Sequence, residues 1–160
     1  MERSPNFFEK YQVIRNVNLY YTNFNVTSRF NHYVLKLVLS QALSTVVTKN
    51  SVFLANLYST SAAKNDPNAY VVRAVKSINF DDVVLFKEIL AFDETVLFDL
   101  DAETCPVDIP LPLWRIVVHE LPAKDGENPI QYITTLFDHS FFDGTSAANF
   151  HQELVEEFAK

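Results

Sequence analysis

Glycine and cysteine are scarce in this chain of 160 residues. The two glycines are Gly126 and Gly144, and the single cysteine is Cys105. A dinucleotide-binding fingerprint needs three closely spaced glycines and a phosphate-binding loop needs two glycines five positions apart, so both are excluded. One cysteine can form neither an internal disulfide nor a cysteine-based zinc site. This cysteine usage suits a reducing, intracellular compartment.

Other signatures are also missing. No run approaches the 18 consecutive apolar residues that a membrane-spanning helix requires. The first residues lack a charged segment followed by an apolar run, so no secretory signal is visible. There is no His-Glu-x-x-His metal helix and no Gly-x-Ser-x-Gly turn around a nucleophilic serine. We therefore expect a cytoplasmic protein that has no metal and no serine nucleophile.

The composition that remains is that of a globular domain. Hydrophobic residues make up 48% of the chain and charged residues 21%, which is enough apolar material for a sizeable core in one domain. Residues 1–80 hold nine Lys or Arg and three Asp or Glu, whereas residues 81–160 hold four and seventeen. No long basic stripe accompanies this acidic half, so nucleic acid is not expected as a partner.

Periodic segments predict a mixture of helices and strands. Helices are expected at 7–14, 32–49 and about 145–158, and strands at 17–30, 52–58, 70–78, 114–121 and 130–138. Asn31 and Thr145 are the expected helix caps. Residues 82–90 fit either a helix or a strand. Irregular or loop segments are expected at 59–67, 93–112 and 121–129. Asp125-Gly126 is the expected turn of the last of these loops.

The last two predicted strands are apolar on both faces, which indicates layers of helix above and below them. Strands and helices do not alternate regularly along the chain. We therefore predict an α/β fold of the α+β type, in which a mixed β-sheet is flanked by helices.

One segment carries a pattern that suggests chemistry. Residues 138–144 read DHSFFDG and join the last predicted strand to the last predicted helix. The strand would deliver His139 to the end of the sheet, and histidine is the usual general base at neutral pH. Asp143 could fold back to hold the turn, and Gly144 would permit a backbone conformation that a Cβ resists. Alternatively, His139 simply ends a strand and Asp143 caps a helix; both interpretations stay open.

Three stretches together resemble the fungal alcohol O-acetyltransferase family. This family lies within the CoA-dependent acyltransferase superfamily, which includes chloramphenicol acetyltransferase and condensation domains. The superfamily signature is His-x-x-x-Asp-Gly, here His139 to Gly144. Residues 9–21 (EKYQVIRNVNLYY) resemble the opening helix and first strand of the fungal family, and residues 112–117 (PLWRIV) resemble its Pro-x-Trp-Arg strand. The three stretches occur in the order of the family.

The resemblance implies both a fold and a mechanism. The fold would be the N-terminal lobe of a chloramphenicol acetyltransferase-like protein. His139 would remove the proton from an acceptor, which then attacks the thioester of acetyl-CoA directly. Asp143 would be structural, paired with an arginine, and Gly144 would shape the loop and allow close approach. Position 138 is Asp, where condensation domains and chloramphenicol acetyltransferase carry a second histidine, and this difference disfavours a condensation domain.

The resemblance also implies what residues 1–160 lack. In this superfamily the active site lies between two lobes or subunits, so we expect residues 1–160 to be one N-terminal lobe without its C-terminal lobe. The residues that bind acetyl-CoA stay unassigned. An alcohol is the expected acceptor and an acetate ester the product. The alternatives are a sphingoid-type amine acceptor, a carnitine or condensation type of transferase, and a non-catalytic binding lobe.

The remaining candidates have simpler interpretations. His32, His119 and His151 read as ordinary residues rather than metal ligands. Arg115 is expected to pair with a carboxylate, and the acidic, proline-rich surroundings of Cys105 would raise its pKa. Tyr20, Tyr21 and Phe24 read as packing residues, or else as lining of an acceptor pocket. Residues 7–14 read as a helix packed on the domain, and peripheral contact with the endoplasmic reticulum or lipid droplets is the alternative.

Overall fold

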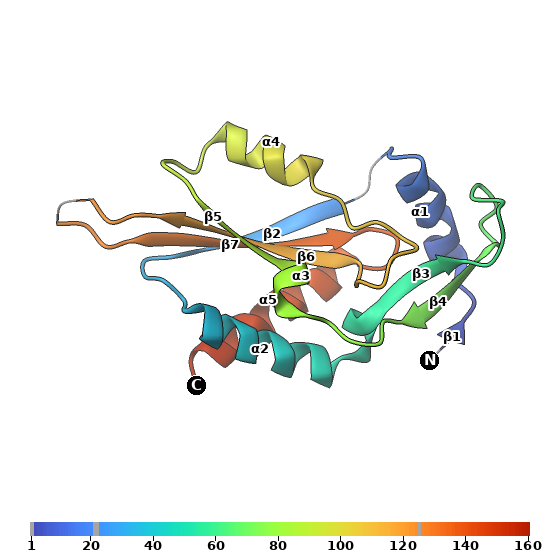
Figure 1. The fold of residues 1–160 in the computed structure, drawn as a ribbon, viewed down its shortest axis with the longest axis horizontal. Helices are drawn as coiled ribbons and strands as arrows, with labels where there is room; N and C mark the ends of the chain where they lie inside the picture. The colour runs from blue at the N-terminus through green and yellow to red at the C-terminus, as the bar shows by residue number, and fades with distance from the viewer. Residues whose placement is uncertain (1, 21–22, 125) are drawn as a thin grey trace.

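The computed structural model describes residues 2–20, 23–124 and 126–160. The elements in chain order are β1 (Glu2–Arg3), α1 (Phe7–Val17), β2 (Asn23–Phe30), α2 (Lys36–Lys49), the 3-10 helix η1 (Ser51–Leu54), β3 (Ala55–Ser59), β4 (Tyr70–Ala74), α3 (Phe80–Val83), β5 (Val84–Glu88), α4 (Glu94–Ala102), β6 (Trp114–Leu121), β7 (Ile130–Asp138) and α5 (Gly144–Phe158). Figure 1 shows how these elements are arranged.

A mixed four-stranded sheet forms the centre of the molecule, as predicted. Its strand order is β2-β7-β6-β5. The pairs β2–β7 and β7–β6 are antiparallel, whereas β5 runs parallel to β6. Helices α2 and α5 cover one face of this sheet and α4 covers the other (Figure 1). This double cover explains why β6 and β7 are apolar on both faces.

A cluster of aromatic side chains fills the core between this sheet and the two helices beneath it. Trp114 on β6 is fully buried and contacts the ring of Phe150 on α5, with centroids 5.6 Å apart. The indole Nε1 donates a hydrogen bond to the Phe53 carbonyl at 2.8 Å. Large aromatic side chains bury the most apolar area per residue, and a buried indole N–H needs an acceptor. Trp114 therefore fixes β6 against α5 and η1.

A second, three-stranded sheet stands beside α1 at one end of the molecule (Figure 1). Its order is β1-β4-β3, and both pairs are antiparallel. The buried amide of Asn56 on β3 donates to the carbonyls of Pro106, Ile109 and Leu111. This one side chain holds the proline-rich segment that leads into β6.

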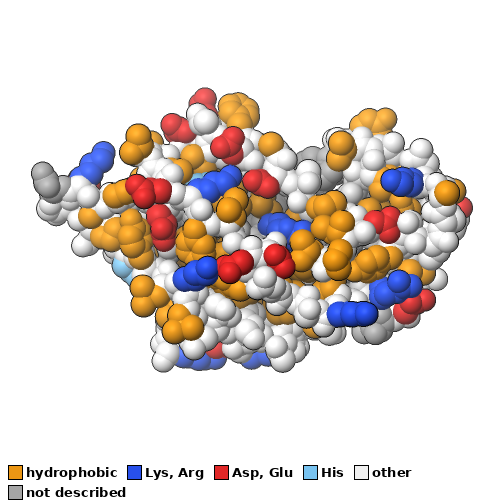
Figure 2. Space-filling view, in the orientation of Figure 1, with side chains coloured by type: hydrophobic (Ala, Val, Ile, Leu, Met, Phe, Trp, Pro, Cys, Tyr) orange, Lys and Arg blue, Asp and Glu red, His pale blue; other side chains and the backbone are white. Residues whose placement is uncertain are grey.

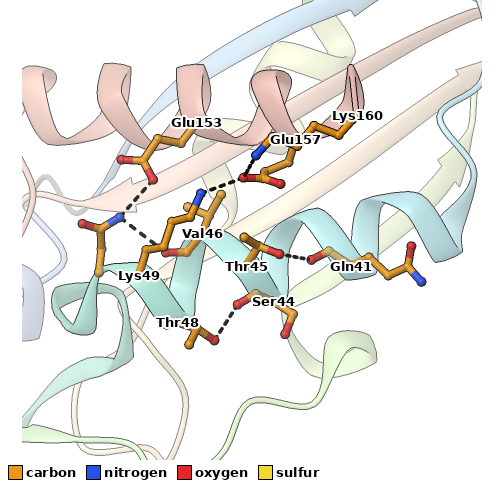
Figure 3. Close-up of polar contacts among 10 residues, drawn as sticks. Gln41, Ser44, Thr45, Val46, Thr48, Lys49, Glu153, Glu157 and Lys160 are labelled. Atoms are coloured by element: carbon orange, nitrogen blue, oxygen red, sulfur yellow. Dashed lines mark hydrogen bonds and ion pairs between the residues drawn. The ribbon is translucent and has the colours of Figure 1, made fainter.

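Polar contacts join α2 to α5 along their outer edge (Figure 3). The Lys49 ammonium lies 2.7 Å from a carboxylate oxygen of Glu157, which also accepts from Lys160 at 2.6 Å. The Asn50 amide donates to Glu153 at 3.0 Å. Exposed ion pairs contribute little to stability, so these contacts orient the helices rather than hold them. Burial of the apolar stripe on α2 supplies most of the attraction between the layers.

Several predicted boundaries were wrong at the start of the chain. The predicted strand 17–30 begins only at Asn23, and α1 extends to Val17. The predicted helix 32–49 begins at Lys36, and Asn31 does not cap it: the cap position is Leu35, which makes no side-chain hydrogen bond. Aromatic and β-branched residues favoured an early strand, but the reciprocal capping of α1 by Asn6 and Glu9 and its packing extend the helix.

The middle of the chain was also predicted only in part. Residues 93–112 contain α4, which the side chain of Asp93 caps by accepting from the Thr95 amide. Residues 82–90, which fitted either structure, divide between α3 and β5. The segment 52–58 begins in η1, and the strand at 70–78 ends at Ala74. Gly126 has a φ of 77°, as a turn glycine should, whereas Asp125 lies outside the described residues.

Strands β6 and β7 have the predicted bounds, and α5 ends at the predicted residue. The fold class is therefore confirmed. The errors concern boundaries, helix caps and three elements that were not predicted, β1, η1 and α4. In the described part of the chain, no helix is both long enough and apolar enough to cross a membrane.

Candidate active site

His139 lies directly after the end of β7, in the turn that leads to α5. Its side chain is half-buried, and its ring stacks at a tilt against Phe24 of β2, with centroids 4.4 Å apart. The imidazole Nδ1 lies 3.3 Å from the carbonyl oxygen of Phe142. A carbonyl oxygen only accepts, so this contact places the proton of the neutral ring on Nδ1. The basic lone pair is then on Nε2, as a general base requires.

The residue before it, Asp138, is fully buried. Its Oδ1 accepts from the Ser140 amide at 2.7 Å, and its Oδ2 accepts from the Asn16 side chain at 2.5 Å. Its main-chain carbonyl accepts from the amides of Phe141 and Phe142. Burial raises the Asp138 pKa to about 6, although the hydrogen bonds from Ser140 and Asn16 act against this rise. Asp138 thus holds the turn that carries His139.

Asp143 lies at the exposed start of α5 and caps this helix. Its Oδ1 accepts from the amide and the hydroxyl of Ser146, both at 2.8 Å. These hydrogen bonds lower the Asp143 pKa. The predicted cap, Thr145, is therefore wrong. No arginine or lysine within the described ranges forms an ion pair with Asp143, so within these residues its role is that of a helix cap.

Gly144 is the first residue of α5. The prediction that its backbone needs a conformation that a Cβ would resist is wrong, because only Gly126 among the described glycines has a positive φ. A Cβ placed on Gly144 would have no heavy atom within 4 Å. The glycine thus leaves open space beside the cap of α5, one residue from Asp143.

Arg115 lies on β6, and Cys105 lies in the segment that leads into this strand. Arg115 is half-buried and donates to the carbonyls of Pro112 and Trp114, at 2.7 and 2.6 Å, rather than to the predicted carboxylate. Burial lowers its pKa. Burial also raises the pKa of the Cys105 thiol to about 12, which confirms the predicted direction. A thiol in this state is a poor nucleophile.

The other histidines are separate from the turn. His119 is buried on β6 with its ring edge against Phe92, and burial lowers its pKa. His151 on α5 shares a hydrogen bond of 2.5 Å with the Ser28 hydroxyl. His32 is exposed and contacts the Asn31 side chain. No group of three potential metal-ligating side chains occurs in the parts of the chain that the structure describes.

Of the three aromatic residues predicted to pack in the core, Tyr20, Tyr21 and Phe24, only Phe24 is seen to pack near His139 among the described residues. Phe24 packs against both Phe137 and His139. Tyr20 is 80% exposed, so it is not a core residue, and Tyr21 lies outside the described residues. Phe24 is thus the predicted aromatic residue that borders the candidate base.

A guanidinium that contacts this turn is engaged by a carboxylate. The Arg3 guanidinium stacks over the ring of Phe141, 5.6 Å from its centroid. Both terminal nitrogens of Arg3 also contact the Glu9 carboxylate, at 2.8 and 2.6 Å. Arg3 therefore braces the turn from β1 and α1, and its charge is already compensated.

Sequence reasoning found His139 and Asp143 but missed Asp138 and Asn16 as parts of the site. Asp138 is adjacent to the histidine, and a charged residue at the end of an otherwise apolar strand was the signal that could have pointed to it. Asn16 lies 122 positions earlier in the chain, and no local spacing pointed to it.

Comparisons with known proteins give a consistent family and fold. A family model described as alcohol acetyltransferase matches residues 6–160. No curated protein sequence matches the chain. Among solved structures, the starter condensation domain of rhizomide synthetase RzmA superposes with a TM-score of 0.71 at 10% identity, covering 98% of this chain and 38% of that one.

Two further solved structures agree. The condensation domain of the monacolin K polyketide synthase MokA has a TM-score of 0.72 at 11% identity, covering 99% of this chain and 34% of that one. The SgcC5 protein from Streptomyces globisporus has a TM-score of 0.65 at 14% identity, and the superposition covers 86% of this chain and 30% of that one. At such low identity these likenesses establish the fold alone. The chain spans between 30% and 38% of the length of these three proteins.

Proposed function

Because the chain belongs to the alcohol acetyltransferase family, we propose that it transfers an acetyl group from acetyl-CoA to an alcohol, with His139 as the general base. The observation that carries the proposal is the Nδ1 contact of His139 with the Phe142 carbonyl, 3.3 Å long. It leaves Nε2 as the basic nitrogen of a neutral, half-buried imidazole. Histidine in this state matches the task of deprotonating a hydroxyl near neutral pH.

The proposed reaction needs no acyl-enzyme intermediate. Nε2 of His139 takes the proton of the alcohol while the alcohol oxygen attacks the thioester carbonyl carbon. The tetrahedral intermediate then collapses, the carbon–sulfur bond breaks, and the imidazolium returns the proton to the departing thiolate of CoA. Cys105 does not compete as a nucleophile, since burial keeps its thiol protonated.

We also propose that groups outside residues 1–160 complete the site. The support is the coverage of 30% to 38% of the solved structures with this fold. Arg3, the cation that stacks on the turn, is already paired with Glu9. The phosphates of CoA and the developing negative charge on the thioester oxygen would thus be bound largely from elsewhere.

The test is acetyl transfer by the full-length protein, measured as CoA release and ester formation with a panel of alcohols. His139→Ala should reduce kcat by about 100-fold or more, since loss of a general base typically costs about 10²–10⁴-fold. His32→Ala is the matched control, because His32 is exposed and contacts Asn31 and the edge of the Phe30 ring rather than the turn of His139. This variant should retain wild-type rates.

The same experiment separates the alternatives. Equal rates for wild type and His139→Ala would overturn the role of His139 as base. Acetylation of a sphingoid-type amine but of no alcohol would reassign the acceptor. No transfer to any acceptor by the full-length protein would favour a non-catalytic binding lobe.

A further inference from the structure

We infer that Asn16 is a positioning residue for His139, acting through the side chain of Asp138. The inference rests on the proposed function, because it assigns Asn16 a role in the same site. Asn16 lies in α1, whereas Asp138 ends β7, so the contact between them ties the first helix to the turn that carries His139.

The contact is short and shielded from water. The Asn16 Nδ2 donates to the Asp138 Oδ2 at 2.5 Å and also lies 3.4 Å from the carbonyl oxygen of Cys105. Asn16 is 6% exposed and Asp138 is 0% exposed. A hydrogen bond from a neutral amide to a buried carboxylate is charge-assisted, and its loss leaves the carboxylate undersatisfied, which is costly.

Asp138 transmits this contact to the imidazole through the turn. Its other carboxylate oxygen accepts from the Ser140 amide, and its main-chain carbonyl accepts from the amides of Phe141 and Phe142. The carbonyl of Phe142 in turn is the partner of the His139 Nδ1. A shift of Asp138 therefore moves the group that selects the tautomer and orientation of His139.

An amide suits this position better than a cation or an acid would. Burial makes the charged form of Asp138 costly, and the donors from Asn16 and Ser140 favour it. The Cys105 thiol, on the segment before β6, is a titratable group close enough for the Asp138 charge to help raise its pKa. Asn16 is the side chain that donates to Oδ2 of this carboxylate.

Gln12 provides a matched control on the same helix. It lies one turn before Asn16 and is also 6% exposed, and its Oε1 has no hydrogen-bond partner among the described residues. Truncating either side chain removes a buried amide from the same face of α1. Only the Asn16 truncation removes a contact to Asp138.

The experiment compares Asn16→Ala, Gln12→Ala, Asp138→Asn and the double variant Asn16→Asp/Asp138→Asn in the full-length protein. We expect Asn16→Ala to lower kcat at least 10-fold with KM changed less than twofold, and to change the dependence of kcat/KM on pH. Gln12→Ala should keep kcat within twofold of wild type. The double variant exchanges amide and carboxylate, and it should recover more activity than Asp138→Asn alone.

A second measurement does not depend on turnover. The tautomer and titration of the His139 imidazole are followed by NMR, with the signal assigned through His139→Ala. We expect Asn16→Ala to change both and Gln12→Ala to change neither. If the full-length protein transfers no acetyl group, the proposed function fails, and this NMR comparison alone decides the positioning role.

Two results would overturn the inference. One is an Asn16→Ala protein that keeps wild-type kcat and wild-type His139 titration. The other is equal loss of activity in Asn16→Ala and Gln12→Ala in proportion to their loss of thermal stability, because that pattern describes general packing of α1. If Asn16→Ala does not fold, the comparison of the double variant with Asp138→Asn decides, and equal activity of these two would contradict the inference.

Discussion

At the scale of single residues, the neighbours Asp138 and His139 show how burial divides two titratable groups between different roles. Asp138 is fully buried and its carboxylate accepts from two donors, whereas His139 is half-buried. The first residue fixes the geometry of the turn, and the second is the one that a substrate could reach. Burial of a carboxyl group opposes its ionisation, so the structural role of Asp138 has a cost in stability that depends on pH.

We predict that Asp138 makes the protein less stable as the pH rises from about 4 to 6. Its pKa is raised from 3.8 to about 6 in the folded state, so in this window the folded protein binds more protons than the unfolded chain does. Stability then falls with pH, by at most about 3 kcal/mol for a rise of this size.

The measurement is the free energy of urea unfolding between pH 4 and 7.5 for wild type and Asp138→Asn. The variant should lack this decline, because its side chain does not titrate. Parallel curves for the two proteins would contradict the assignment.

At the scale of secondary-structure elements, the start of α5 combines a helix cap with open space. Asp143 satisfies backbone donors of the first turn, and its pKa is lowered because Ser146 donates to the charged form. The next residue is Gly144, which has no side chain, and the space that its Cβ would occupy is open. This element therefore presents its N-terminus to its surroundings without obstruction, directly after the turn that holds His139.

We predict that Asp143→Ala destabilises the protein by about 1 kcal/mol, the usual cost of losing a helix cap, whereas Asp143→Asn costs less because asparagine also caps well. The readout is the unfolding free energy at pH 7. For wild type, the contribution of the ionised cap is present above the ordinary aspartate pKa and disappears as the pH falls through the lower folded-state value. A large loss of kcat in Asp143→Asn with unchanged stability would show that Asp143 does more than cap α5.

At the scale of the whole molecule, large apolar side chains remain exposed at several places, including two groups at α1 and α4. One group lies on α1, where Phe7, Phe8 and Tyr11 are between 53% and 89% exposed. The other lies on and before α4, where Leu90 and Phe98 are 89% and 70% exposed. Figure 2 shows hydrophobic side chains at α4 and at α1, with a hollow in the outline between them. Large exposed apolar groups of this kind mark surfaces that contact something else.

We predict that residues 1–160 expressed alone turn over acetyl-CoA weakly, at least 100-fold below the full-length protein if that protein is longer. The reason is that the proposed site draws its CoA-binding groups from outside these residues. The assay is CoA release at saturating acetyl-CoA and alcohol, with circular dichroism as the control for folding. Robust turnover by the folded 160-residue chain would show that these residues suffice.

The sequence alone determined the parts of this protein that depend on local pattern. Strands β6 and β7 were predicted at their observed bounds because continuous apolar runs between turn residues allow little else. The position of His139 at the end of β7 followed from the same pattern. Local propensity failed where packing or capping decided: it extended a strand back to Val17 and left α4 as a loop.

Only the tertiary structure decided what surrounds the histidine. It brought Asn16 to Asp138 across 122 positions, stacked Phe24 on the imidazole, and assigned Asp143 to the cap of α5 rather than to an ion pair. These contacts join separate elements, so their partners are set by how α1, β2 and β7 pack together. A single sequence carries no spacing that encodes such pairs, whereas burial in the folded chain favours a partner for a polar group such as the Asp138 carboxylate, which accepts from Asn16 and from the Ser140 amide.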